Sequence, residues 1–375
     1  MSLDAGTIPG GPETTASDAG DDGDDEGPEV PAPPPFDPFG DKAILPIHLA
    51  FSPEAMDTIE ERGNPTVEAV ATVGDLPDTS ITVSLRNQTK DLTGLLGKAG
   101  FTLHFDGLEE EGRLGAYRKL RLENMVRDKS LMREAFSTWV FRSLEVPAAQ
   151  TRYVWLKVNE EDFGLYLAVE APGETPFLDR WFQGSNGIVY ETRGNRDVVT
   201  DKVRGFTLTR GEDPEQEALL ALATALDSLQ ERPGDALDDL GALVDMDAFL
   251  RLSAIETLLG QKKGYVHGTR RYALHLGGEE ARWTWMPLGL DQVFQDIIDP
   301  LEGKGRIQAI CLGDVPCRLA LAAEVEKEAE VEEEEEEEAE EEDDEESARR
   351  SRRRVKTMTT RRTYDRRPSA TGQEL

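Results

Sequence analysis

The sequence predicts an α+β protein whose ordered part is flanked by charged, disordered tails. Short segments that alternate apolar and polar residues, rich in β-branched side chains, dominate the first third of the chain. Segments with apolar residues three and four positions apart, each opened by an aspartate that can cap a helix, follow them. The excess charge lies mainly at the two ends. Together these features predict a β-rich N-terminal part and a mostly helical C-terminal part.

The charge of the chain is unevenly distributed. Among 375 residues, 75 are acidic and 42 are basic, which gives a net charge of -33. Residues 1–41 carry eleven acids and no base, residues 324–346 carry eighteen acids and one lysine, and residues 349–367 carry ten bases and one aspartate. Such segments bury too little apolar surface to offset the entropy lost on ordering. We expect a disordered acidic, proline-rich linker over 1–41, a folded domain over 42–323 and a disordered tail, acidic and then basic, over 324–375.

The composition argues against several functional classes. No apolar run approaches the roughly 20 residues that a membrane span requires, so we expect no transmembrane segment. The first 30 residues contain neither a basic start nor an apolar core, so no secretory signal is visible. The mildly acidic folded part argues against nucleic acid as its main partner. Two cysteines and four scattered histidines are too few for a typical structural zinc site.

Eight segments are predicted to be strands from their alternation and their β-branched or aromatic content. They are Ile44–Phe51, Thr66–Val73, Ser80–Leu85, Gly100–Phe105, Arg152–Val158, Phe163–Glu170, Arg271–Leu276 and Arg282–Met286. The polar residues 159–162 predict a hairpin between the fifth and sixth strands, and Gly277-Gly278 predicts another between the last two.

Three helices are predicted from their caps and their periodicity. Asp128 precedes a segment in which Leu131, Ala135 and Trp139 recur every four residues, and Pro147 ends it. The sequence Asp213-Pro-Glu-Gln216 predicts a capped start, with leucines at 219, 220, 226 and 229 on the buried side. Asp245 predicts the start of a third helix, and Gly260 its end.

A glycine-rich segment next to a lysine invites comparison with phosphate-binding loops. Gly94-Leu-Leu-Gly97-Lys98 is not a Walker A motif, because Leu92 stands where glycine is needed and Ala99 where serine or threonine is needed. A turn between two strands is therefore the favoured interpretation. Lys98 remains a cation at the start of a strand, where it could meet a phosphate.

Two other features leave alternatives open. Asp291 follows a predicted strand and has apolar neighbours, a setting in which metal-binding carboxylates often occur, although a solvated turn aspartate would look the same. Cys311 and Cys317 are six residues apart near the end of the predicted folded part. They would form a disulfide in an oxidising compartment or remain two free thiols.

Several segments, taken in order, resemble the CotH family of spore-coat and envelope kinases. The resemblance extends from about residue 44 to 320. The segments that carry it are Asn124–Ala135, Val146-Pro147, Phe163–Glu170, Gly187–Glu191, Pro287–Phe294 and the stretch around Cys311 and Cys317.

This resemblance implies an atypical protein-kinase-like fold with two lobes. A β-rich N-terminal lobe, a hinge and a mostly helical C-terminal lobe would enclose ATP and Mg²⁺ as cofactors. Lys98 would hold phosphates and Glu134 would orient that lysine, as a lysine–glutamate pair does in kinases. Glu170 would lie near the hinge, Trp285 would stack on adenine, and Asp291 would bind magnesium.

The sequence also departs from the family pattern at the expected catalytic positions. Lys263 stands where relatives have an acidic residue before Gly-Tyr, and Arg270 and Arg271 stand where they have an asparagine pair. Gly289 stands where many relatives have aspartate. A lysine does not easily replace a carboxylate base, and arginine has only donors and cannot ligate magnesium. The catalytic residue is therefore left unassigned.

Two functions follow from the resemblance and its departures. The first is ATP-dependent phosphoryl transfer to an envelope or spore-coat protein. The second is a catalytically silent pseudokinase or a structural scaffold for surface interactions. The resemblance suggests the cell envelope or the extracellular space, whereas the sequence shows no export signal, so the location is left open.

Overall fold

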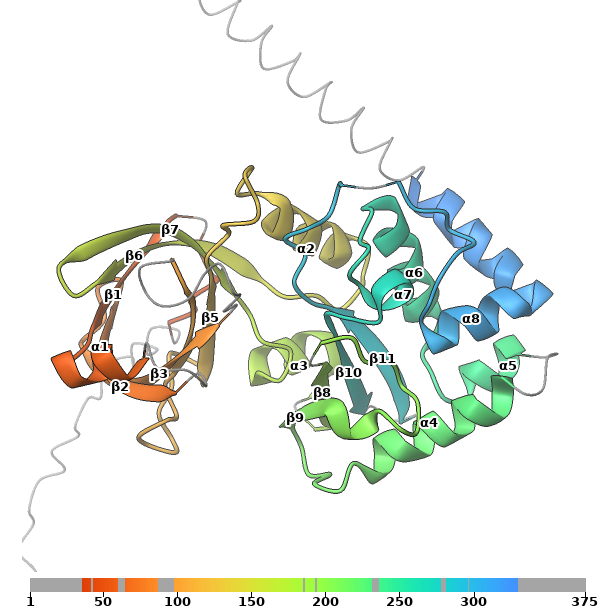
Figure 1. Cartoon of the computed structure of the whole chain (residues 1–375), viewed down its shortest axis with the longest axis horizontal. Helices are drawn as coiled ribbons and strands as arrows, with labels where there is room; N and C mark the ends of the chain where they lie inside the picture. Colours follow the sequence, from red (N-terminus) through yellow and green to blue (C-terminus); the bar gives the residue numbers. More distant parts are fainter. Residues whose placement is uncertain are drawn as a thin grey trace, which may run out of the picture. The chain divides into compact units, whose positions relative to one another are not determined.

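The computed structural model describes residues 36–329 except 42, 60–64, 87–97, 185, 193, 231–235, 278–280 and 296. These residues form two β-sheets with associated helices, which confirms the α+β class (Figure 1). The described part begins at Phe36 rather than at 42, because Phe36 and Phe39 pack against the first core. It continues to residue 329 in a helix over 315–329, although we expected the tail to begin at 324. Residues 1–35 and 330–375 of the two predicted tails lie outside the described residues.

The first sheet is a closed barrel with the strand order β1-β2-β3-β4-β5-β7-β6. β1 pairs with β6 in parallel, and every other neighbouring pair is antiparallel. Alternate side chains of these strands fill its interior. The strands are β1 (Leu45–Ala50), β2 (Thr66–Val73), β3 (Thr79–Arg86), β4 (Gly100–His104), β5 (Lys119–Glu123), β6 (Thr151–Val158) and β7 (Glu161–Val169).

Six of these seven strands were predicted, and the sequence analysis missed β5 and the short helix α1 (Pro53–Ile59). In β5, Leu120 and Leu122 are buried and alternate with the charged residues Lys119, Arg121 and Glu123, which face outward. Its alternation is regular, but the strand is short and mostly charged, so the sequence pattern did not predict it. Barrel closure was not predicted either, because the β1–β6 pairing joins segments more than 100 residues apart.

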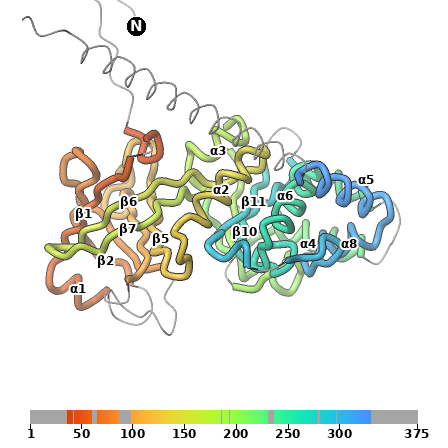
Figure 2. The backbone as a smooth tube through the Cα atoms, turned by 90° about the horizontal axis from the view of Figure 1, so that it is seen from above, coloured from red at the N-terminus to blue at the C-terminus, as the bar shows by residue number. Residues whose placement is uncertain are grey.

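The predicted hairpin of β6 and β7 is confirmed, and Figure 2 shows its two strands side by side. The turn is shorter than predicted, because Val158 pairs with Glu161 and only Asn159 and Glu160 remain between the strands. Asn159 adopts a φ of 50°, which asparagine tolerates better than most residues. Its side chain accepts a 2.8 Å hydrogen bond from the Phe51 amide, which ties the hairpin to the end of β1.

The second sheet has four antiparallel strands in the order β11-β10-β8-β9. The predicted hairpin of β10 and β11 is confirmed, and helices contain more residues than strands in this half of the chain, as expected. The strands are β8 (Ile188–Thr192), β9 (Phe206–Arg210), β10 (Tyr272–Gly277) and β11 (Arg282–Pro287). The helices are α2 (Arg133–Ser143), α3 (Thr175–Phe182), η2 (Val203–Gly205), α4 (Glu217–Gln230), α5 (Ala236–Gly241), α6 (Met246–Leu258), α7 (Tyr265–Gly268) and α8 (Arg306–Gly313).

One of the three predicted helix caps is confirmed, and the other two aspartates lie farther from the start of their helices than predicted. Asp245 caps α6 by accepting the Ala248 amide at 3.2 Å, as predicted. Asp128 accepts the Arg133 amide at 2.8 Å, so α2 begins five residues after it and not directly behind it. Asp213 likewise accepts the first amide of α4, that of Glu217, at 2.8 Å. These two aspartates bind a helix start across an intervening turn, a geometry that the sequence pattern did not specify.

Cys311 and Cys317 form a disulfide with their Cα atoms 5.0 Å apart, which settles the alternative left open by the sequence. Both are fully buried in the largest core cluster. The bond joins the end of α8 to the helix over 315–329. None of the helices in the described ranges is long and apolar enough to cross a membrane.

Candidate functional site

A cavity of about 620 Å³ lies where strands of the barrel approach the second sheet. Its walls come from β3, β5 and β7 of the barrel, from α2, from the end of β8, and from the loops before β10 and after β11. The lining contains six cationic side chains, namely Arg86, Arg121, Arg127, Lys263, Arg270 and Arg271. It contains four carboxylates, those of Glu123, Glu134, Glu191 and Asp291. In a chain with a large acidic excess, this cavity is a cationic region.

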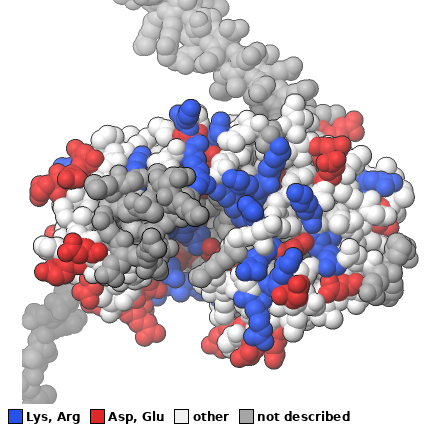
Figure 3. Space-filling view, in the orientation of Figure 1, with Lys and Arg blue, Asp and Glu red and all other residues white. Residues whose placement is uncertain are grey.

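The space-filling view shows the same concentration. Lysine and arginine side chains gather across the middle of the face drawn in Figure 3, whereas the acidic side chains on that face lie mostly toward its edges. A concave, cationic surface of this kind attracts anions, because low-dielectric walls focus the electrostatic field.

Two ion pairs brace the side of the cavity that the barrel forms. Arg86 on β3 pairs with Glu123 on β5 at 2.9 Å. Arg121 on β5 pairs with Glu191 on β8 at 2.5 Å, and this contact joins the barrel to the second sheet. These pairs neutralise two of the six cations locally and hold the two sheets at the cavity wall.

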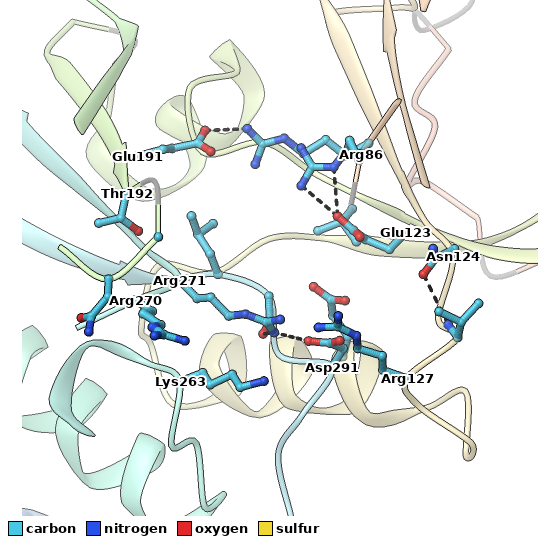
Figure 4. Close-up of a pocket in the computed structure, with 18 residues that line it drawn as sticks. Arg86, Glu123, Asn124, Arg127, Glu191, Thr192, Lys263, Arg270, Arg271 and Asp291 are labelled. Carbon is cyan, nitrogen blue, oxygen red and sulfur yellow. Dashed lines mark hydrogen bonds and ion pairs between the residues drawn. The ribbon is translucent and has the colours of Figure 1, made fainter. Parts of the chain in front are cut away.

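A third ion pair involves the aspartate that the resemblance assigned to magnesium. Arg271 donates to Asp291 and also to the Gly289 carbonyl oxygen, the latter at 2.5 Å (Figure 4). The other oxygen of Asp291 accepts a 3.3 Å hydrogen bond from Gln292. Gly289 has a φ of 59°, and a Cβ there would press on the Arg271 side chain at 3.1 Å. Glycine at 289 therefore makes room for the arginine that neutralises Asp291.

Three cations retain charge that the described residues do not neutralise by a direct ion pair. Lys263 donates to the neutral Gln292 side chain. The side chains of Arg127 and Arg270 are exposed and form no hydrogen bond or ion pair with a described residue. Burial and then the nearby Arg271, Arg127 and Arg270 lower the pKa of Lys263. These cations crowd one another, and a bound anion would relieve their repulsion.

Glu134, at the start of α2, is a buried carboxylate of the cavity wall. Burial, together with the negative charges of Glu123 and Asp291, raises its pKa to about 8, although Arg271 and Arg86 act in the opposite direction. The raised pKa favours the protonated form of Glu134 at neutral pH. Its neutrality preserves the cationic character of the cavity, because an ionised carboxylate there would oppose a bound anion.

Replacing Glu134 with glutamine should stabilise the protein in a pH-dependent way. The unfolded chain releases the proton near the ordinary pKa of 4.5, whereas the folded chain keeps it until about pH 8. The wild type therefore loses stability as the pH rises through this window, and the Glu134→Gln variant does not lose that part. Thermal melting at pH 5, 7 and 9 should show a midpoint difference that grows between pH 5 and 8 and then levels off. A difference independent of pH would contradict the raised pKa.

The loop that carries Lys263 is anchored by another buried carboxylate. Glu256 on α6 is fully buried and accepts the amides of Tyr265 and Val266 at 3.0 and 2.9 Å. Burial raises its pKa to about 7, although these two amides act in the opposite direction. A Cβ at Gly264 would collide with its carboxylate. Glu256 therefore fixes the turn next to Lys263 and requires glycine there.

The residues predicted for the site separate into two groups. Glu134, Lys263 and Asp291 meet in the cavity. Lys98, Glu170 and Trp285 do not line it. The glycine-rich segment before Lys98 falls in 87–97, outside the described residues.

Lys98 and Trp285 occupy other surroundings than the resemblance implied. The Lys98 ammonium donates to the Leu165 carbonyl oxygen at 3.0 Å and lies 5.0 Å from the centre of the Tyr166 ring. Trp285 is 1% exposed and packs in the core against Phe249. In this structure it has no free face on which an adenine ring could stack.

Glu170 lies at the junction between the barrel and α3, close to where the resemblance placed a hinge. It follows β7 and is almost fully buried. Its carboxylate accepts two hydrogen bonds from Arg180 on α3, at 2.8 and 3.0 Å, and one from the Gln150 amide at 3.0 Å. These contacts make Glu170 a link between the two parts of the chain.

Several charged residues of the cavity were not predicted from the sequence. Arg121 and Glu123 are outward positions of the unpredicted strand β5, and Arg127 follows it. Glu191 was part of a segment that carried the family resemblance, but no role was assigned to it. Arg121 and Glu123 alternate with buried leucines, and this pattern was the available signal for a sheet face that carries charge.

The described residues contain no group of three or more histidine, cysteine, aspartate or glutamate side chains that could hold a metal ion.

The sequence matches the family model described as CotH kinase protein over residues 92–346, which is most of the chain. No curated protein matches the chain. The match covers β4 to α8, and therefore all of the cavity lining except Arg86. The chain belongs to the CotH kinase family.

Proposed function

We propose that this CotH-family chain is a pseudokinase that binds the phosphates of a nucleotide such as ATP and does not transfer them. In this proposal the barrel and the second sheet with its helices correspond to the two lobes of a kinase-like fold. The position of the cavity supports this correspondence, because both halves contribute to its lining. The ion pair of Arg121 with Glu191 connects the same two halves.

The observation that carries the proposal is the pairing of Arg271 with Asp291. Magnesium requires oxygen ligands in octahedral geometry, and kinases hold it through carboxylate and amide oxygens. Here the single aspartate of the segment 287–294 already binds an arginine, and Gly289 offers no carboxylate. The residues present therefore do not fit a magnesium ion at this position.

The cations of the cavity do fit the phosphates of a nucleotide. Lys263, Arg127 and Arg270 would contact the phosphates directly and take over part of the charge neutralisation that metal ions provide in kinases. Lys263 occupies the position that the resemblance gives to the catalytic acidic residue, and a protonated lysine cannot accept the proton of a substrate hydroxyl. Lysine at position 263, in place of an acidic residue, thus removes the catalytic base and adds a contact to the phosphates.

The proposed role is that of a binding partner for an envelope or spore-coat protein, with nucleotide as a ligand and not as a phosphate donor. The disulfide of Cys311 with Cys317 supports an oxidising location such as the cell envelope, because disulfides persist there. Phosphoryl transfer to such a protein is the alternative function, and an assay of γ-phosphate transfer tests it.

Calorimetric titration with ATP should show binding in EDTA at least as tight as binding with magnesium. The Asp291→Ala variant should bind ATP as tightly as the wild type or more tightly, because the substitution removes a negative charge and releases Arg271. A magnesium-dependent kinase would behave in the opposite way and lose binding. Transfer of labelled γ-phosphate to water or to a protein acceptor should be absent for both chains.

Two results would refute the pseudokinase proposal. ATP binding that requires magnesium and disappears in Asp291→Ala would show that the aspartate holds a metal despite Arg271. Absence of ATP binding in every condition would show that the cavity is not a nucleotide site. Thermal melting of both chains without ligand is the control for folding.

A further inference from the structure

Helix α2 presents an unusually apolar face to solvent. Met132, Phe136 and Trp139, together with Phe294 from the loop after β11, have exposed fractions between 43% and 59%. The Phe136 ring lies 5.7 Å from the Trp139 ring and 5.9 Å from the Phe294 ring. We call these four residues the aromatic patch. Contiguous exposed apolar side chains of this size usually mark an interaction surface.

The four residues of the aromatic patch do not belong to any of the hydrophobic core clusters of the described residues. α2 already packs on its other side through Val140 and Phe141, which belong to the largest core cluster. Of the residues that recur every four positions and predicted this helix from the sequence, Leu131 and Trp139 are exposed, whereas Ala135 is partly buried. The aromatic side chains make contacts with one another, but their outer faces remain open to a further partner.

The aromatic patch adjoins the cationic cavity. Phe136 follows Glu134 of the cavity wall by two residues, and Phe294 follows Asp291 by three. Three residues of chain span at most about 10 Å. Val126 and Arg127 of the cavity lining are also exposed. A ligand in the cavity could therefore extend onto the patch with only a few residues between the two contacts.

We propose that the aromatic patch and the cations Arg127, Lys263 and Arg270 form one bipartite docking surface for an acidic segment of a partner protein. The carboxylates of that segment would enter the cavity, and a bulky apolar side chain next to them would cover Phe136, Trp139 and Phe294. Charge complementarity selects an acidic partner, because Arg127 and Arg270 have no ion pair within the described residues.

The concave shape of the site favours a polypeptide over an anionic membrane. Lys263 lies partly buried in the lining of the cavity, where an inserted side chain reaches it more readily than a flat lipid surface does. An extended peptide can insert carboxylates into a cavity of this size and still place an apolar side chain outside it. Buried aromatic contacts with a ring of polar contacts are a common arrangement at protein interfaces.

Fluorescence anisotropy on the full chain tests the proposal with three labelled probe peptides. The first contains a run of glutamates followed by Leu-Phe-Leu, the second contains the glutamates alone, and the third has glutamine in place of each glutamate and keeps the apolar end. The first probe should bind at least ~10-fold more tightly than either of the others, as expected when two contacts act together.

A pair of variants separates the patch from the cavity. The Phe136→Ser/Trp139→Ser variant should weaken binding of the first probe ~10-fold and leave the acid-only probe unchanged. The Trp155→Ser variant is the matched control, because Trp155 is 46% exposed but lies on β6 of the barrel. It should bind all three probes as the wild type does.

Several outcomes would overturn the proposal. Equal binding of the bipartite and acid-only probes would mean that the patch takes no part. An equal loss in both tryptophan variants would mean that the effect is not specific to α2. Binding to phosphatidylglycerol vesicles that is lost in Phe136→Ser/Trp139→Ser, without any peptide binding, would assign the surface to a membrane.

The docking surface and the proposed nucleotide site share Arg127, Lys263 and Arg270, so ATP and the acidic segment would compete, but the two proposals can fail separately. The Phe136→Ser/Trp139→Ser variant should bind ATP as tightly as the wild type, since these residues do not line the cavity. Peptide binding without any ATP binding would refute the pseudokinase proposal and leave the docking surface intact. ATP binding without a difference in affinity among the three peptides would refute the docking surface and leave the pseudokinase proposal intact.

Discussion

Replacing Gly264 with alanine should lower the free energy of unfolding by about 3 kcal/mol. A Cβ at this position would collide with the buried Glu256 carboxylate, which the Tyr265 and Val266 amides hold. The carboxylate would have to leave at least one of these donors, and a buried charge without its partners is costly. Urea denaturation measures the loss, and ATP titration of the folded fraction should also show weaker binding, because the turn next to Lys263 moves.

Two comparisons test this explanation. Gly241→Ala is the matched control, because a Cβ at the end of α5 meets no atom within 4 Å, and its effect should stay below ~1 kcal/mol. The double variant Glu256→Ala/Gly264→Ala should lose less stability than the sum of the two single variants, because the shortened side chain leaves room for the new methyl group. Additive losses would place the effect of Gly264 somewhere other than its contact with Glu256.

Neutralising the three cations of the cavity that lack a carboxylate partner should weaken ATP binding by about two orders of magnitude. Each charge-assisted hydrogen bond to a phosphate contributes about 1 kcal/mol or more, and 1.4 kcal/mol corresponds to a factor of ten in affinity. The variant is Arg127→Gln/Lys263→Gln/Arg270→Gln. These side chains have no described ion pair to lose, so the unfolding midpoint should change little.

The control for the cation variant changes the same net charge elsewhere. Lys157, Lys202 and Arg204 are exposed and do not line the cavity, so their replacement by glutamine should reduce affinity less than ~3-fold. The dependence of affinity on salt should also become shallower only in the cavity variant, because fewer charges then meet the phosphates. Equal losses in the two triple variants would show that ATP responds to the overall charge and not to the site.

Local patterns in the sequence determined most of the secondary structure. β2 coincides with its predicted bounds, since alternation over Thr66–Val73 depends only on which side of a strand each residue faces. Asp245 caps α6 as predicted, because an N-cap interacts with amides only a few residues away. β5 was missed because its alternating leucines are only two and its other residues are charged.

The sequence determined part of the candidate site. The departures at Lys263, Arg270, Arg271 and Gly289 were visible without a structure, and all four residues line one cavity. Lys98 was assigned from its place before a strand and from the family resemblance, and Trp285 from the resemblance alone; neither specifies the direction of a side chain. In the fold Lys98 binds a backbone carbonyl group of the barrel, and Trp285 faces the core.

What only the tertiary structure decided is which charges neutralise one another. Arg271 and Asp291 are separated by 20 residues, Arg121 and Glu191 by 70, and no local pattern relates them. The turn at Gly289 and the approach of β5 to β8 bring these groups together. The sequence by itself determined the residue types, most of the strands and the departures from the family pattern. The fold decided that Asp291 pairs with an arginine and that Lys263, Arg127 and Arg270 form no ion pair with a described residue, because electrostatic partners depend on distances in space and not along the chain.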